Sequence, residues 1–308
     1  MSERSIVFGA NNGLVGTLAL PVAPTGGAAE IGFLLFNAGV VHRVGPHRIN
    51  VRLARQLAAG GIASIRFDLA GHGDSVRPSG DHSFEEQAVI DVRSAMDALG
   101  AAAKLQRFAI FGYCSGAYYG FETALADERV AGILMFDAYR YPTLKTHAHH
   151  YWNRLRQPRV VRGLLGAMQR GIASLGRRVR VPTGGGEERP VPERGRIDVI
   201  PSKGEFAEGL RTLLGRGVKI HMIYSGGAIR EYNYRRQFKD TFAGYDIGGR
   251  VEAEFLPDLD HVATGLADQA DLMRRVIAWG RELGAMPAGG DGGAFSTIKG
   301  ERVNQEVY

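Results

Sequence analysis

Short apolar runs bounded by glycine and turn residues alternate with amphipathic stretches from the N-terminus to about residue 137. Such alternation predicts βαβ units, in which a helix connects two parallel strands. Buried strands are predicted for IGFLLFN, ASIRFD, RFAIFG and VAGILMFD, and two further strands for VKIHMIYS and VEAEFLP. The earlier runs SIVF and LVGTLAL flank Asn11-Asn12-Gly13, which is typical of an antiparallel hairpin turn. The pattern therefore predicts a mostly parallel sheet of about eight strands, flanked by helices.

Apolar positions at helical spacing predict two amphipathic helices. One stripe consists of Ala88, Val92, Ala95, Met96 and Leu99, and the other of Leu266, Ala270, Met273, Val276 and Ile277. A third helix is expected over REYNYRRQF, residues 230–238, where arginines and aromatic residues alternate. These segments place helices before, between and after the strands, as an α/β protein requires.

The connection between the strand ending at Asp137 and the strand starting near Val218 is far longer than an ordinary loop. A helix is predicted at its start, around HHYWNRLRQ, and it contains the glycine- and proline-rich stretch PTGGGEERPVPERG. We therefore expect a first core part over residues 1–142, an inserted basic lid over 143–203, a second core part over 204–284 and a flexible tail over 285–308.

Composition and charge narrow the class of protein. The chain has a single cysteine, so no internal disulfide can form, and no long apolar run or leader-like segment predicts a membrane span or export. A cytoplasmic protein is the expectation. The net charge of +6 is concentrated in residues 140–198, which hold 13 Lys or Arg but 4 Asp or Glu. An anionic ligand, an acidic protein, a membrane surface and a solvated basic face all remain open, and no motif predicts nucleic-acid binding.

The stretch Gly112-Tyr113-Cys114-Ser115-Gly116 follows an apolar strand and precedes a helical stretch, which is the context of a nucleophile elbow. The residues two before and two after the nucleophile must be small, because the turn presses the backbone against its neighbours. Gly112 and Gly116 satisfy this requirement around Cys114, whereas Tyr113 and Ala117 flank Ser115. Cys114 is therefore the favoured nucleophile, Ser115 the competitor, and simple packing of a small apolar cysteine the alternative.

A histidine follows the last predicted strand. His261 lies in LPDLDHVAT, late in the chain and after the candidate nucleophile, where a catalytic base is expected. The neighbouring Asp260 more plausibly shapes the loop. The other histidine-rich stretch, THAHHYW, lacks the spacing of a metal site, and neither a metal nor another cofactor is predicted.

These residues resemble the α/β-hydrolase fold, and DLAGHGDS, residues 68–75, carries a further superfamily motif. More narrowly, residues 31–140 resemble hydrolases associated with the exosortase A system, in the serine aminopeptidase S33-like group. The resemblance implies Cys114 as nucleophile and His261 as base. It implies an oxyanion hole built from backbone N–H groups of Ala38, Gly39, Val40 and Ser115.

The segment R-V-G-x-H-R is shared with that group as well. Here it consists of Arg43, His47 and Arg48 with their neighbours. The resemblance implies that these residues order a loop or contact an anion, and Arg43 and Tyr113 are the candidate substrate-binding residues.

The acid that should orient the histidine departs from the usual pattern. Where relatives have S-G-x-D, this chain has Ser225-Gly226-Gly227-Ala228, and alanine cannot orient an imidazole. Asp137 ends the preceding strand, where members of the group tend to have asparagine, and is the favoured replacement. Glu231 is the competitor. A cysteine and histidine can also ionise without an acid.

The sequence therefore predicts a hydrolase that cleaves an ester or thioester through an acyl-Cys114 intermediate. An acyltransferase using the same intermediate and a non-catalytic ligand-binding homologue are the alternatives. The expected partner is a small-molecule or carrier-bound acyl substrate, with an acidic acyl carrier protein as one form of donor. Neither the acyl acceptor nor the oligomeric state is predicted.

Overall fold

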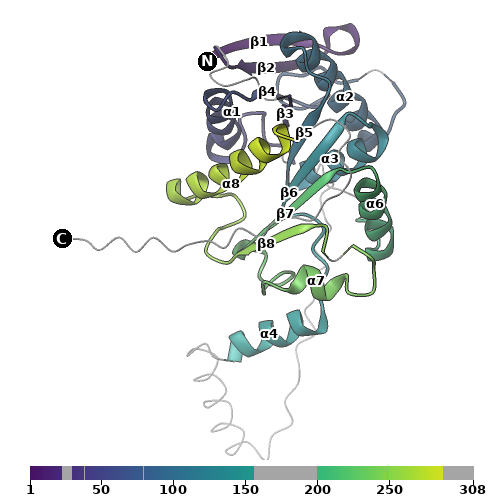
Figure 1. The fold of residues 1–308 in the computed structure, drawn as a ribbon, viewed down its shortest axis with the longest axis vertical. Coiled ribbons are helices and arrows are strands. Elements are labelled where there is room, and N and C mark those ends of the chain that lie inside the picture. The colour runs from purple at the N-terminus through teal and green to yellow at the C-terminus, as the bar shows by residue number, and fades with distance from the viewer. Residues whose placement is uncertain (23–29, 38, 79, 156–199, 248, 287–308) are drawn as a thin grey trace, which may run out of the picture.

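One eight-stranded sheet runs through the protein, whose computed structural model describes residues 1–22, 30–37, 39–78, 80–155, 200–247 and 249–286 (Figure 1). The strand order is β1-β2-β4-β3-β5-β6-β7-β8. The strands are β1 (Ser2–Phe8), β2 (Leu14–Leu20), β3 (Gly32–Leu35), β4 (Ala63–Phe67), β5 (Phe108–Tyr113), β6 (Val130–Phe136), β7 (Lys219–Ser225) and β8 (Glu252–Leu256).

The strand directions agree with the pattern in the sequence. β1 and β2 form the expected antiparallel hairpin, joined through the short helix η1 (Ala10–Asn12), and β2 runs antiparallel to β4. Each remaining neighbour pair, from β4 and β3 to β7 and β8, is parallel. All residues of β3, β4 and β5 are buried, because helices cover both faces of a parallel sheet. The predicted fold class is confirmed.

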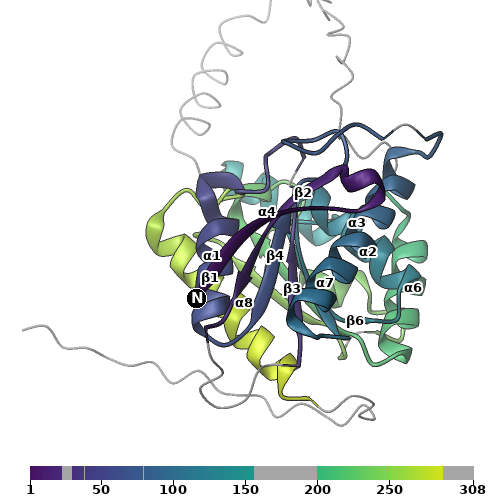
Figure 2. The ribbon, with the colours of Figure 1, turned by 90° about the horizontal axis from the view of Figure 1, so that it is seen from above.

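Helices form a layer on each side of the sheet (Figures 1 and 2). On one face lie α1 (Ile49–Ala59) and α8 (Leu266–Gly284), and on the other α2 (Phe84–Ala103), α3 (Ser115–Ala126) and α6 (Lys203–Gly215). Each layer encloses its own cluster of buried apolar side chains. The stripe predicted on α2 is confirmed, since its five residues are at most 1% exposed.

The stripe predicted on α8 is wrong at its start. Leu266 is 68% exposed and Ala270 is also exposed, whereas Leu272, Met273 and Val276 are buried. The helix turns its next buried residues, Trp279 and Leu283, to the sheet as well. The first turn of α8 therefore extends past the core, next to the loop that contains His261.

The helix predicted over residues 230–238 is also wrong. This segment forms turns after η3 (Gly226–Ala228), and only the short α7 (Gln237–Thr241) is helical. The side chain of Gln237 accepts a hydrogen bond from the N–H of Asn233 and donates one to the carbonyl of Glu231. These bonds replace helical backbone bonds, while Tyr232 stacks on Tyr224 of β7 at 3.7 Å between ring centroids.

Of the predicted insertion, only the two ends lie within the residues that the structure describes. It begins with α4 (Leu144–Leu155), which extends beyond α7 in Figure 1. Residues 156–199 of the insertion and 287–308 of the tail lie outside the described part of the chain. The core resumes at α6, which contacts α3 and β7. The boundaries at 142, 203 and 284 stay predictions. Within the described residues, no helix has both the length and the apolar character needed to cross a membrane.

Candidate active site

Four polar groups lie at or just after the ends of four neighbouring strands, at one edge of the sheet. Cys114 comes directly after β5 and Asp137 directly after β6. Ser225 is the last residue of β7, and His261 lies in the loop that follows β8. Because parallel strands end at the same edge, the topology brings these groups together from distant parts of the sequence.

Cys114 sits in a sharp turn between β5 and α3. Its backbone has φ 52° and ψ −119°, an unfavourable combination for a residue with a side chain. The turn is held because the N–H of Cys114 donates to the carbonyl of Phe136 at 2.9 Å and α3 begins at the next residue. The thiol therefore lies on a sharp turn directly before the N-terminus of α3.

The two glycines around Cys114 are required by close packing. A Cβ at Gly112 would lie 2.4 Å from the Cα of Ala117, and one at Gly116 would lie 2.7 Å from the carbonyl oxygen of Asn37. Both distances are shorter than any real Cβ contact. The spatial requirement that favours Cys114 over Ser115 in the sequence is met by the fold.

His261 is held by Asp137. Its Nδ1 lies 2.8 Å from Oδ2 of Asp137, whose side chain is fully buried. The same carboxylate accepts hydrogen bonds from the backbone N–H and the hydroxyl of Ser225. Since Nδ1 faces Asp137, Nε2 is left for Cys114, with which His261 shares a hydrogen bond. The residues thus form a linked series from thiol to imidazole to carboxylate.

The competing acid does not reach the histidine. Glu231 is 51% exposed and pairs with Nε of Arg140 at 2.8 Å, while Ala228 ends η3. Asp260 accepts hydrogen bonds from the N–H groups of Val262 and Thr264, so it shapes the loop. Of the carboxylates considered from the sequence, Asp137 is the one that the structure brings to His261.

The stretch Ser225-Gly226-Gly227 explains how the histidine loop comes so close. A Cβ at Gly226 would lie 1.9 Å from the carbonyl oxygen of Pro257, and one at Gly227 would lie 2.6 Å from the backbone nitrogen of His261. The loop therefore lies directly on this backbone. The sequence shows that the usual acid is absent from this stretch. It does not reveal that Ser225 holds Asp137, the carboxylate that replaces that acid.

The electrostatics of the pair favour ionisation. Burial by itself raises the pKa of the Cys114 thiol, but the hydrogen bond and charge of His261, the N–H of Ser115 and the charge of Arg140 outweigh it, so the net pKa is lowered. The hydrogen bond to Asp137, followed by that to Cys114, raises the pKa of His261 to about 9. Both shifts favour a thiolate paired with an imidazolium over the neutral pair.

The predicted oxyanion loop contacts the elbow through a side chain. The N–H of Gly39, which has φ +56°, donates to the hydroxyl of Ser115 at 2.5 Å. The N–H of Ser115 lies against the sulfur of Cys114. Val40 is 67% exposed at the rim, and Ala38 lies outside the described residues. The hydroxyl of Ser115 thus fixes the loop, a role that the sequence did not reveal.

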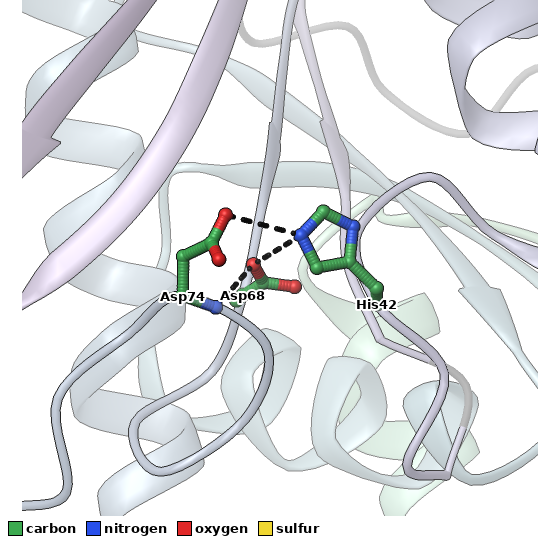
Figure 3. Close-up of side chains that lie close together, drawn as sticks. All are labelled: His42, Asp68 and Asp74. Carbon is green, nitrogen blue, oxygen red and sulfur yellow. Dashed lines mark hydrogen bonds and ion pairs between the residues drawn. The ribbon is translucent and has the colours of Figure 1, made fainter.

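Asp68, directly after β4, forms hydrogen bonds with two loops near the elbow: the loop after β3 and the loop after β4. Its buried carboxylate accepts hydrogen bonds from the side chain of Asn37 at 3.1 Å and the N–H groups of Arg43 at 2.6 Å and Asp74 at 3.2 Å. Figure 3 shows the ring of His42 facing the carboxylates of Asp68 and Asp74. The predicted oxyanion loop and the loop of residues 68–75 are therefore tied to one buried group.

This cluster already contains a cationic side chain. Nη1 of Arg43 contacts the carboxylate of Asp68 and lies 2.7 Å from that of Asp74. A metal ion at His42, Asp68 and Asp74 would have to compete with this guanidinium. Arg43 has a side chain only 12% exposed and orders the loop.

The other candidate substrate-binding residue, Tyr113, is 3% exposed. Its hydroxyl donates to the carbonyl of His261, so it supports the histidine loop from below. Arg140, in contrast, is 25% exposed, and its charge acts on Cys114. The sequence places Arg140 in the basic segment but does not reveal that it lies near the thiol of Cys114.

Comparisons with known proteins agree with this architecture. The esterase domain of a Rhodothermus marinus protein is 17% identical with a TM-score of 0.54, covering 91% of this chain and 99% of that one. An α/β serine hydrolase without a lid from Xanthomonas campestris is 15% identical, with a TM-score of 0.52 and coverages of 93% and 96%. An α/β serine hydrolase homologue from Coxiella burnetii is 13% identical, with a TM-score of 0.53 and coverages of 90% and 97%.

These structures establish the fold, and a family model matches part of the chain. The protein has the α/β-hydrolase fold. Residues 39–178, less than half of the chain, match the model of the serine aminopeptidase S33 family. Among curated proteins, the search found no match to the sequence.

Replacing His261 with alanine should shift the pH profile of Cys114 alkylation upward, because burial then raises the thiol pKa without its main opposing partner. In the unaltered protein, the thiolate should persist below the ordinary thiol pKa of about 8.5. Iodoacetamide labelling followed by intact-mass measurement reports this directly, since Cys114 is the single cysteine. His149→Ala is the matched control, and an unshifted profile in His261→Ala would contradict the pairing.

Proposed function

We propose that the protein is a hydrolase that cleaves an ester or thioester through a covalent acyl-Cys114 intermediate. The observation that carries this proposal is the linked series of Cys114, His261 and Asp137 at the carboxyl edge of the sheet. A thiol, a base within hydrogen-bond reach and a third group that orients the base form the general arrangement for nucleophilic catalysis. The match of residues 39–178 to the serine aminopeptidase S33 family model is consistent with it.

In the first half-reaction, His261 holds the thiol proton and the sulfur attacks the acyl carbon. The bond from that carbon to the leaving oxygen or sulfur breaks, and the imidazolium returns the proton to the leaving group. In the second half-reaction, His261 takes a proton from water, and the hydroxide attacks the acyl-cysteine. The acid is released, and Cys114 regains its proton.

Asp137 orients His261 and stabilises the imidazolium at both stages. Its three hydrogen bonds, two from Ser225 and one from Nδ1, hold the carboxylate in one position. The N–H of Ser115 is one donor for the tetrahedral oxyanion, and the loop containing Ala38 and Val40 supplies the second. The N–H of Gly39 is engaged by Ser115, so its part is to hold the loop.

An ester or thioester suits this site better than an unactivated amide. A thiolate leaves the tetrahedral intermediate more readily than an amine does unless that amine is protonated. The basic segment and Arg140 favour a donor with negative charge, such as an acyl-CoA or the thioester of an acidic acyl carrier protein. The nearby charge of Arg140, which lowers the pKa of Cys114, supports this choice.

Two other functions use parts of the same site. An acyltransferase would replace water with another nucleophile at the second step. A non-catalytic homologue is suggested by the alanine at position 228, but the carboxylate of Asp137 at the histidine removes the main reason for that interpretation. Hydrolysis therefore remains the proposed activity. Whether water or another nucleophile accepts the acyl group can be determined from the decay of the acyl-Cys114 adduct.

Brief exposure to activated esters and acyl thioesters should produce an acyl adduct on Cys114, because the lowered pKa of its thiol favours attack. Peptide mass spectrometry locates the adduct, and Cys114→Ala is the control. Decay of the adduct in water alone indicates a hydrolase, whereas decay only with an added alcohol, amine or thiol indicates an acyltransferase. If Cys114 acquires no adduct from any donor, the enzymatic proposal is wrong.

Asp137→Asn should lower kcat/KM by roughly 10²- to 10⁴-fold, because an amide presents an N–H to Nδ1 and selects the wrong imidazole tautomer. Glu231→Gln makes the same chemical change at the competing position and should cost less than about tenfold, since its ion pair with Arg140 is half exposed. Steady-state hydrolysis by the two variants gives the comparison. The reverse ranking would assign the orienting role to Glu231.

Arg140→Gln should lower kcat/KM for an acyl-CoA about tenfold more than for the neutral N-acetylcysteamine thioester of the same acyl group, because one charged hydrogen bond is lost. The ratio of the two substrates removes any general effect on the Cys114 pKa. Arg211→Gln, on the exposed side of α6, is the control. An unchanged ratio would exclude Arg140 as an anion contact.

A further inference from the structure

A second cluster of polar side chains lies away from the thiol, under α8. His221 is on β7, and Glu252 and Glu254 are on β8, the last strand of the sheet. His221 is paired with Glu252 in the parallel register, and Glu254 lies two residues further on. Four residues separate His221 from Ser225, roughly 13 Å along the strand. The cluster is therefore distinct from the candidate active site.

One nitrogen of His221 is fixed by Glu254. Nε2 lies 2.8 Å from Oε1 of Glu254, and Arg275 on α8 contacts the other oxygen of the same carboxylate. Arg275 is also held by Asp271 at 2.9 Å. Since a carboxylate only accepts hydrogen bonds, Nε2 carries the proton. With that proton on Nε2, Nδ1 on the other side of the ring is the nitrogen that can offer a lone pair.

That second nitrogen, Nδ1, is buried and has no hydrogen-bond partner. The side chain of His221 is only 4% exposed, and the nearest carboxylate oxygen, Oε2 of Glu252, lies 3.6 Å away. This separation is too long for a hydrogen bond. A lone pair facing a carboxylate without a positive charge between them is unfavourable, so the arrangement calls for a cation.

We propose that Nδ1 of His221 and the carboxylate of Glu252 bind a divalent transition-metal ion of the zinc class. Bonds of about 2.0–2.2 Å from one ion to two atoms 3.6 Å apart enclose an angle of about 110–128°, at or somewhat above the tetrahedral angle. Water completes the coordination. Glu252 is 55% exposed, which leaves the ion a path from solvent.

The surroundings match those of known metal-binding histidines. Glu254 is the carboxylate that accepts the other ring N–H, which fixes the tautomer and raises the basicity of the ligand. Arg275 is neutralised by Glu254 and Asp271, so its charge opposes the ion only weakly. The ion would fasten the edge strand β8, which leads into the loop containing His261.

Zinc titration by calorimetry of the full-length chain, freed of metal by chelator, tests this site. Cys114→Ala serves as the background, because the thiol and His261 can themselves bind zinc. Adding Glu252→Gln should weaken the binding of one ion at least about tenfold. Glu282→Gln, an exposed glutamate on α8, is the matched control and should leave binding unchanged. Cobalt absorption should show the tetrahedral signature in the background protein and in the Glu282→Gln control, but not in the Glu252→Gln variant.

Two results would overturn the proposal. Equal zinc affinity in the Glu252→Gln variant would place the ion elsewhere, and no binding by the background protein would mean that a proton alone occupies the position between the two groups. Because Glu252 is exposed, its substitution should preserve the fold, which circular dichroism verifies. As a second readout, zinc should raise the melting temperature of the background protein and of the Glu282→Gln control, but not of the Glu252→Gln variant.

Discussion

The hydrogen bond between His261 and Asp137 is the interaction on which the geometry of the site depends. It joins the loop after β8 to the end of β6, across the end of β7. Ser225 occupies that intervening strand end and donates two hydrogen bonds to the carboxylate. A buried carboxylate is unfavourable without partners, and here three donors satisfy it. The imidazole is thereby directed at Cys114 by groups from three consecutive strands.

A second constraint is the close approach of backbones around the elbow. The strained conformation of Cys114 persists because α3, β6 and the loop after β3 all press against it. Gly116 allows the carbonyl of Asn37 to lie against the start of α3, and the hydroxyl of Ser115 holds Gly39 from the other side. Asp68 then fixes the rest of that loop. These contacts would position the proposed oxyanion region before any substrate arrives.

The fold was predictable from sequence because buried parallel strands and the α2 stripe are local patterns. For the candidate site, the close packing at the glycines around Cys114 was predictable because that requirement is also local. The sequence left Asp137 and Glu231 open, since the choice depends on which strand end faces the histidine loop. The helix expected at 230–238 failed because the side chain of Gln237 takes over backbone bonds. His221 and Glu252 escaped notice because they meet only through strand pairing.

The position of the acid follows from the sheet itself. β6 and β7 are adjacent and parallel, so carboxylates at the ends of either strand approach the same point above the edge. A carboxylate on β6 must cross the end of β7 to reach the histidine, and it needs a partner there. Ser225 supplies that partner, while Gly226 and Gly227 let the histidine loop descend onto it. Because a thiol ionises more easily than a hydroxyl, a cysteine nucleophile makes smaller demands on this displaced acid than a serine would.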